Sequence, residues 1–189
     1  MAINLKIDDS ELKKAVSKLG NFPKEMPKAA ASAINRTLTF TRKRVNQEVR
    51  KTYNIKAGDV NKTLEIHKAS ASNLTAYIIS KGKRLTLGRF GRNTGSWRKG
   101  KPVKVKVKKD GVKTVNTNPT AFIAGLTGNS HIVKRKGASR YPIEVLHTLS
   151  VPQMISNEKV SDKVQEEARE KLQERIDHEV KYRLGKYSK

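Results

Sequence analysis

The residues with the clearest chemistry are the cations of one stretch, Lys81 to Lys113. It contains thirteen lysine and arginine residues and a single anion, Asp110, so it carries a formal +12, half of the +24 of the 189-residue chain. Charge of one sign at this density repels itself unless anions condense on it or an acidic surface lies against it. The stretch therefore predicts a polyanionic partner. A solvated basic loop that only keeps the protein soluble would have the same composition.

The cations expected to contact DNA or an acidic partner are Lys81, Lys83, Arg84, Arg89, Arg92, Arg98, Lys99, Lys101, Lys104, Lys106 and Lys108. Phe90 and Trp97 are the only aromatic residues of the stretch, whereas a groove that binds single strands presents several stacking rings. Contact with phosphates or with protein is therefore favoured over base reading.

An enzyme is not indicated. Gly88, Gly91 and Gly95 resemble a phosphate loop in spacing, but no lysine follows in the required place and Pro102 interrupts the region. The chain has no Gly-x-Ser-x-Gly turn and no pair of carboxylates in an apolar setting. The middle of the chain is too poor in carboxylates for the metal site of a nuclease. We expect no catalytic residue and no cofactor.

The histidines do not predict a metal site. His131 precedes the apolar pair Ile132-Val133, and a lone histidine in an apolar strand is usually packed or hydrogen-bonded rather than functional. His67, His147 and His178 are scattered without ligand spacing, and the chain has no cysteine. The lack of cysteine also fits a reducing compartment.

Length and composition predict one domain. A chain of 189 residues can bury a substantial core, although its apolar content is low and 31 % of its residues are charged. No run of about eighteen apolar residues suggests a membrane span, and Met1–Asp9 lacks the features of a signal peptide. We expect a protein made in the cytoplasm that does not bind membranes.

Hydrophobic periodicity predicts three helices. The first follows a strand at Ile3–Ile7, is capped by Asp8 or Asp9 and ends at Gly20. The second runs from Pro27 to about Lys51 with one apolar stripe, a long rod for a domain of this size.

The third helix runs over residues 157–185. Its apolar residues recur every four positions, so the stripe turns by about 40° per step and no flat surface could cover it. Either this helix bends, or its ends pack on different surfaces, such as its own sheet and a neighbouring subunit. Two roles could explain its many acidic residues. They could form intrahelical pairs, such as Glu167 with Lys171, or they could contact the basic stretch of the next subunit.

Alternation with period two predicts antiparallel hairpins. Leu64–Ile66 and Leu74–Ser80 form the first, and Val103–Val107 with Val112–Val115 form the second, around the turn Asp110-Gly111. The second hairpin has valine on one face and lysine on the other, and its lysines either lie on phosphates or form the wet side of an ordinary sheet. Phe122-Ile123 and Ile132-Val133 are predicted core strands, with Gly125 and Gly128 shaping the bend between them.

The chain from Ala29 to Met154 also carries a series of short motifs. They are Ala33-Ile34-Asn35-Arg36-Thr37, Leu85-Thr86-Leu87, Ala121-Phe122-Ile123, Gly128, His131, Arg135, Arg140-Tyr141-Pro142-Ile143-Glu144 and Ser150-Val151-Pro152. In order and total length they resemble the minor tail protein Z family of lambda-type long-tailed phages, the tail completion proteins.

The resemblance implies a structural protein of the virion, at the head-proximal end of the tail. There it would complete the tail, help join it to the head and position the end of the genome, as a subunit of a ring of six copies. Its partners would be further copies, other tail and neck proteins and the genomic DNA in the lumen. The motif residues expected to be structural are Asn35, Arg36, Phe122, His131, Arg135, Arg140, Tyr141, Pro142, Ile143 and Glu144.

The predicted fold is α+β in one domain of residues 1–189: an antiparallel sheet of about four to six strands, packed by the long helix and flanked by the C-terminal one. Residues 81–113 form a basic insertion, of which Lys81–Lys101 is a partly mobile arm. Pro142 predicts an extended Tyr141 and a chain reversal that ends in Glu144, with which Arg135 and Arg140 could pair unless they reach a neighbouring subunit. The alternative function is a cytoplasmic protein that binds nucleic acid without sequence preference.

Overall fold

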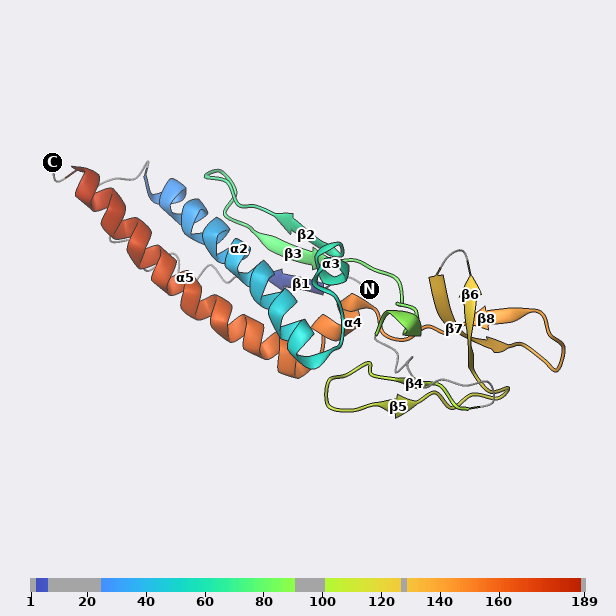
Figure 1. Cartoon of the computed structure of the whole chain (residues 1–189). Helices are drawn as coiled ribbons and strands as arrows, with labels where there is room; N and C mark the ends of the chain where they lie inside the picture. Colours follow the sequence, from blue (N-terminus) through green and yellow to red (C-terminus); the bar gives the residue numbers. More distant parts are fainter. Residues whose placement is uncertain (1–2, 7–24, 91–100, 127–128, 188–189) are drawn as a thin grey trace.

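The fold is α+β, as predicted, and two long helices form its main axis. The computed structural model describes residues 3–6, 25–90, 101–126 and 129–187. Helix α2 (Met26–Thr52) and helix α5 (Glu158–Tyr187) run alongside each other for most of their length (Figure 1). Both agree with the helices predicted from the sequence. The helix predicted between Asp8 and Gly20 lies outside the described residues.

The contact between α2 and α5 is built on residues spaced by four in both helices. On α2 these are Ala29, Ala33, Thr37, Thr41, Val45 and Val49, and on α5 they are Val160, Val164, Ala168, Leu172, Ile176 and Val180; all are buried. A spacing of four residues is longer than the 3.6 residues of one helical turn, so each row shifts around its helix in the same right-handed sense. The two rows therefore stay in contact when the helices wind about each other.

This arrangement corrects the expectation that the two ends of α5 pack on different surfaces. The row from Val160 to Val180 is buried within the chain along α2, because α2 carries a row with the same drift. Leu184, the next residue of the pattern, is 36 % exposed.

Ion pairs link the two helices along their length. Arg44 of α2 forms a bidentate pair with Glu167 of α5, and Arg183 near the end of α5 pairs with Glu25 at the start of α2. The intrahelical pair predicted for Glu167 and Lys171 is wrong, since Lys171 bonds Glu174 at 2.5 Å instead. The Arg44 and Glu167 side chains are long enough, and are so directed, that they meet across the interface between α2 and α5.

The first sheet covers one side of α2. Strand β3 (Tyr77–Ser80) lies between β1 (Ile3–Lys6) and β2 (Leu64–His67), and all pairings are antiparallel. The hairpin predicted at 64–80 is therefore confirmed. Short helix α3 (Ala57–Asn61) connects α2 to this sheet.

The other strands form two further small sheets beyond the ends of the helices (Figure 1). Strand β4 (Lys104–Val105) pairs with β5 (Lys113–Thr114), while β7 (Asn129–Arg135) lies between β6 (Phe122–Leu126) and β8 (Ile143–Val145). Helix α4 (Val151–Ile155), capped by Ser150, leads into α5. Both predicted strand pairs are present.

Two expectations need correction here. The strands do not form one sheet of four to six strands but three separate small sheets. The first packs along α2, whereas the second is hydrogen-bonded near the end of that helix. Gly125 does not shape a bend: it lies within β6, opposite Ser130 of β7. No helix in the described ranges is long and apolar enough to cross a bilayer.

Removing a buried side chain from α2 tests the importance of this packing. Leu38 is 1 % exposed, so Leu38→Ala should lower the free energy of unfolding by about 2–5 kcal/mol through lost burial and a residual cavity. Chemical denaturation followed by circular dichroism measures this. Lys43→Ala, on the exposed face of the same helix, should change it by less than about 0.5 kcal/mol. Equal losses of unfolding free energy in the two variants would contradict the assignment of Leu38 to the core.

The pair between Arg44 and Glu167 predicts an acid-sensitive contribution to stability. The hydrogen bonds from Arg44 hold the pKa of Glu167 below its usual 4.5, so the folded state favours the ionised carboxylate. The contribution of such a carboxylate to stability is fully present at pH values above 4.5. It is lost as the pH falls through the lowered pKa of the folded state. Glu167→Gln should therefore lower Tm at pH 7, and the difference from wild type should vanish under strong acid. Asp110→Asn, in an exposed turn, is the control.

Candidate interaction surfaces

The first part of the basic stretch is held on ordered backbone. The Leu85 amide donates to the Leu149 carbonyl at 3.2 Å, and the Thr148 amide donates to the Leu85 carbonyl at 2.8 Å. A short 3-10 helix, η2 (Leu87–Arg89), leads to Phe90, which is fully buried. Residues 81–90 are therefore part of the body, where the sequence predicted the start of a partly mobile arm.

The predicted contact cations of this segment divide into paired and unpaired ones. Lys81 bonds Glu65 at 2.8 Å and Arg89 bonds Asp59 at 2.6 Å. Lys83 and Arg84 are exposed and form no ion pair with any residue that the structure describes. Arg92, Arg98, Lys99 and Trp97 lie outside the described residues. Phe90 belongs to the core, so it is not available to stack on a base.

The hairpin of β4 and β5 presents lysine outward, as predicted. Val103 and Val105 are each 2 % exposed, whereas Lys104 and Lys108 are exposed and Lys106 is half-buried. We call Lys104, Lys106 and Lys108 the lysine row. None of the three forms an ion pair with a described residue.

Backbone hydrogen bonds fix this hairpin to the end of α2. The Asn54 amide donates to the Val107 carbonyl and the Lys109 amide donates to the Thr52 carbonyl, both at 2.9 Å. Tyr53 and Lys108 form an antiparallel bridge between these bonds. The lysine row therefore has a defined position relative to the helices. Lys101 lies just before the hairpin and is exposed.

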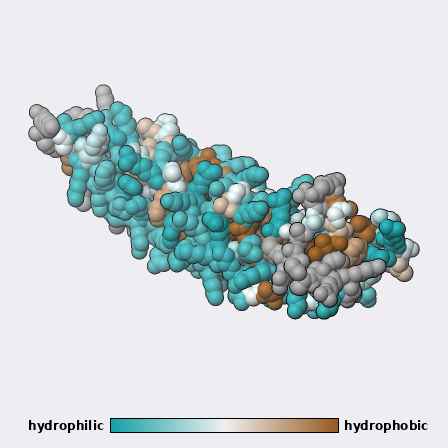
Figure 2. Space-filling view, in the orientation of Figure 1, coloured by the Kyte–Doolittle hydropathy of each residue, from teal (hydrophilic) through white to brown (hydrophobic). Residues whose placement is uncertain are grey.

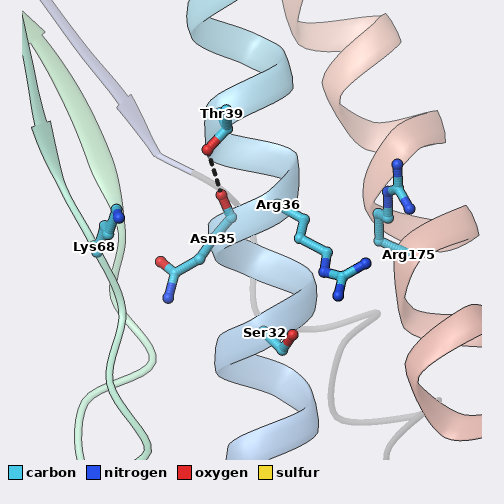
Figure 3. Close-up of a pocket in the computed structure, with 6 residues that line it drawn as sticks. All are labelled: Ser32, Asn35, Arg36, Thr39, Lys68 and Arg175. Atoms are coloured by element: carbon cyan, nitrogen blue, oxygen red, sulfur yellow. Dashed lines mark hydrogen bonds between the residues drawn. The ribbon is translucent and has the colours of Figure 1, made fainter. Parts of the chain in front are cut away.

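A second cationic surface lies over the middle of α2. A shallow hollow of about 570 Å³ is lined by Ser32, Asn35, Arg36, Thr39, Lys68 and Arg175. Figure 3 shows α2 as its floor, with Lys68 beside the first sheet on one side and Arg175 from α5 on the other.

Two of the predicted motif residues have defined roles in this hollow. The Asn35 side chain donates to the Ala69 carbonyl and accepts from the Ala69 amide, each at 2.9 Å, and so joins α2 to the segment after β2. Arg36 lies 3.4 Å from a carboxylate oxygen of Glu179, which is only 3 % exposed. Three cations and no carboxylate line the hollow, so it can accept an anionic group.

Sequence reasoning found Asn35 and Arg36 but missed Lys68 and Arg175. Arg175 lies 139 positions after Arg36, and nothing in its local sequence indicates that it would face the middle of α2. The antiparallel pairing of α2 and α5 brings it there.

The other motif residues gather on the third sheet, at the far end of the molecule (Figure 1). The Arg135 guanidinium lies over the Phe122 ring, 5.9 Å from its centroid, and Arg140 lies over the Tyr141 ring at 5.6 Å. Glu144 pairs with Lys134 at 3.8 Å, so the predicted pairing of Glu144 with Arg135 or Arg140 is not seen.

The loop between β7 and β8 is an exposed basic tip. The Lys136 amide donates to the Pro142 carbonyl at 3.0 Å and closes the reversal, just before Ile143 begins β8. Tyr141, which precedes a cis Pro142, is 65 % exposed. Arg140 and Tyr141 thus offer a cation and a ring to a partner.

His131 lies in β7 opposite Ala124. Its Nδ1 atom is buried without a hydrogen-bond partner among the described residues. No group of three or more histidine, cysteine, aspartate or glutamate residues in those ranges is placed to hold a metal ion. His67 stacks on Tyr77, with ring centroids 4.4 Å apart, and the His147 ring bonds the Val145 carbonyl at 2.9 Å.

Charge is distributed unequally along the molecule. Residues 81–149 contain seventeen cations and two anions, a formal +15, whereas α5 contains eight of each and is neutral. The surface over the two helices is predominantly hydrophilic in the view of Figure 2. These features indicate polar contacts with an anionic partner around the basic stretch.

Comparison with known proteins gave one match. A family model described as "Prophage minor tail protein Z (GPZ)" matches residues 10–189. No curated protein and no solved structure matches the chain.

A sulfate titration followed by NMR tests the hollow on α2. Sulfate should shift the side-chain amide of Asn35 and the backbone amide of Lys68, because three cations line the hollow. Arg175→Gln should weaken this binding about tenfold, which corresponds to about 1.4 kcal/mol, a typical value for a charge-assisted hydrogen bond. Lys62→Gln, exposed outside the hollow, should leave it unchanged. Unaltered binding to the Arg175 variant would refute the site.

Proposed function

This chain belongs to the prophage minor tail protein Z family, and from that premise we propose that it completes the head-proximal end of the phage tail as one subunit of a ring. The match covers nearly all of the chain and confirms the resemblance drawn from its motifs. The protein is a structural component of the phage tail, and hence of the virion, and not an enzyme. As a tail protein it contacts other tail proteins.

The proposed position at the head-proximal end, with a role in joining head to tail and positioning the end of the genome, is supported by the unequal charge. The formal +15 of residues 81–149 fits either genomic DNA in the lumen or acidic tail and neck proteins. The observation that carries the proposal is that the backbone of residues 81–90 and of the hairpin of β4 and β5 is hydrogen-bonded to the body and presents Lys83, Arg84 and the lysine row, which form no ion pair with a described residue.

A ring makes the need for an anionic partner stronger. Six copies, the number we favour, would carry a formal +144, since each chain has +24. Mutual repulsion of this size opposes closure unless negative charge lies beside the basic surfaces. The hollow on α2 and the exposed tip at Arg140 and Tyr141 offer further contacts for neighbouring proteins.

Charge reversal at two unpaired cations tests this function. A prophage that carries Lys83→Glu/Arg84→Glu should produce folded protein but few infectious particles, because the variant repels its anionic partner. Titre after induction and the fraction of tails joined to heads in electron micrographs are the measurements. Lys62→Glu/Lys181→Glu is the matched control, with the same change of net charge at exposed lysines elsewhere.

Normal titre from the Lys83/Arg84 variant would contradict the proposed role of the basic surface. Binding of purified protein to a DNA duplex identifies the partner, since contacts with phosphates give a steep dependence on salt. A variant that loses titre but binds the duplex like wild type has lost an acidic protein partner. Wild-type protein that coats duplex DNA and is absent from purified tails would instead favour a nucleic-acid-binding function.

A further inference from the structure

The exposed face of α5 carries carboxylates in a regular row. Asp162, Glu166, Glu170 and Glu174 are all exposed and follow one another at intervals of four residues. Each lies two positions after a residue of the buried row, which is about 200° around the helix. This acidic row, as we call it, therefore points away from α2 and toward solvent.

The acidic row is not explained by the packing of the chain. Carboxylates four residues apart on one helix repel each other, so the row opposes helix formation rather than supporting it. Glu166 and Glu170 form no ion pair or side-chain hydrogen bond with a described residue, and Asp162 accepts only from the neighbouring Ser161 hydroxyl at 3.1 Å. Glu174 has one partner, Lys171. A cationic partner outside the chain would relieve this repulsion.

The lysine row of the second sheet has matching charge and a similar spacing. A four-residue step along α5 is about 6 Å, so the acidic row is about 18 Å long. A two-residue step along an extended strand is about 6.7 Å, and Lys104 and Lys106 are separated by one such step at strand β4, before the chain bends at Val107. Lys104 and Lys106 can therefore face two successive carboxylates with small adjustments of their long side chains. Both rows lack partners of opposite charge within the described chain, apart from the Lys171 contact of Glu174.

We propose that the acidic row of one copy docks on the lysine row of a second copy. Two different surfaces meet in this contact, so each copy keeps one free row of each kind and can add a further copy. A head-to-tail contact of this type closes into a ring when its rotation is right, or extends into a filament. The inference rests on the proposed function, because it supplies the contact between ring subunits.

A second copy fits the acidic row better than DNA does. Phosphates would be repelled by four carboxylates, so this face excludes DNA, although the lysine row alone could accept either partner. The contact also brings negative charge to one of the most basic surfaces of a chain of +24. It thereby lowers the repulsion between subunits where that repulsion is strongest.

Charge-swapped variants test the contact in solution. Variant one is Glu166→Lys/Glu170→Lys and variant two is Lys104→Glu/Lys106→Glu. Each alone places like charges at the contact and should remain monomeric under conditions in which wild type forms oligomers. In an equimolar mixture, the lysines on α5 of variant one meet the glutamates of variant two, while the unaltered rows meet each other. The mixture should therefore regain the oligomer, and light scattering measures its mass.

Matched controls separate the contact from net charge. Asp177→Lys and Lys62→Glu/Lys181→Glu change the net charge at exposed positions outside both rows, and each should form oligomers like wild type. Circular dichroism checks that every variant is folded.

Two results would overturn the contact. Oligomers of wild-type mass from either swapped variant alone would refute it and leave a ring built through other surfaces. Swapped variants that stay monomeric in the mixture would also refute it. Wild type that stays monomeric even on purified tails would overturn the ring itself, and with it the proposed function, so the two failures are distinguishable.

Discussion

The packing of α5 on α2 is the contact on which the rest of the structure depends. Both helices use residues spaced by four, so their apolar rows drift together and remain in contact from Val49 and Val160 at one end to Ala29 and Val180 at the other. The first sheet packs on the other buried side of α2. The hairpin of β4 and β5 forms backbone hydrogen bonds at the C-terminal end of α2. An isolated two-stranded hairpin is only marginally stable, so the hairpin of β4 and β5 depends on this attachment.

The helix pair also explains where the acidic residues go. Glu48 is 5 % exposed and lies within ion-pair distance of Arg44, Lys51 and Lys163, while Glu179 is bonded by the Ser32 hydroxyl at 2.8 Å. A buried carboxylate needs such partners, because unpaired burial of charge is costly. Several exposed cations elsewhere, such as Lys83, Arg84 and the lysine row, form no ion pair with a described residue. The proposed anionic partner would supply the missing negative charge.

Neutrality of α5 conceals two different faces. The side toward α2 has carboxylates matched to cations of its own chain, such as Glu167 with Arg44, whereas on the opposite side only Glu174 of the acidic row has an ion pair with a described residue. The ion pairs within the chain stabilise the fold, and the exposed acidic row is available to bind a partner. A similar division holds in the second hairpin, where Val103 and Val105 fill the core while Lys104 and Lys108 face outward, although Val112 is also exposed.

The amino-acid sequence by itself determined the elements and the family. Period-four and period-two patterns are local, so the long helices, the hairpins and the inward valines could all be read from them, as could the excess of cations near Phe90. Other features were decided by the tertiary structure. Arg175 joins Arg36 because α2 and α5 run antiparallel, and Lys68 lies nearby because the Asn35 side chain bonds Ala69. Glu167 pairs with Arg44 and not with Lys171 because it faces the partner helix. The strands pair in three separate sheets, of which the first packs on α2 and the second is bonded to its end. Such choices depend on which surfaces meet, and a pattern along one segment carries no information about the segment that will cover it.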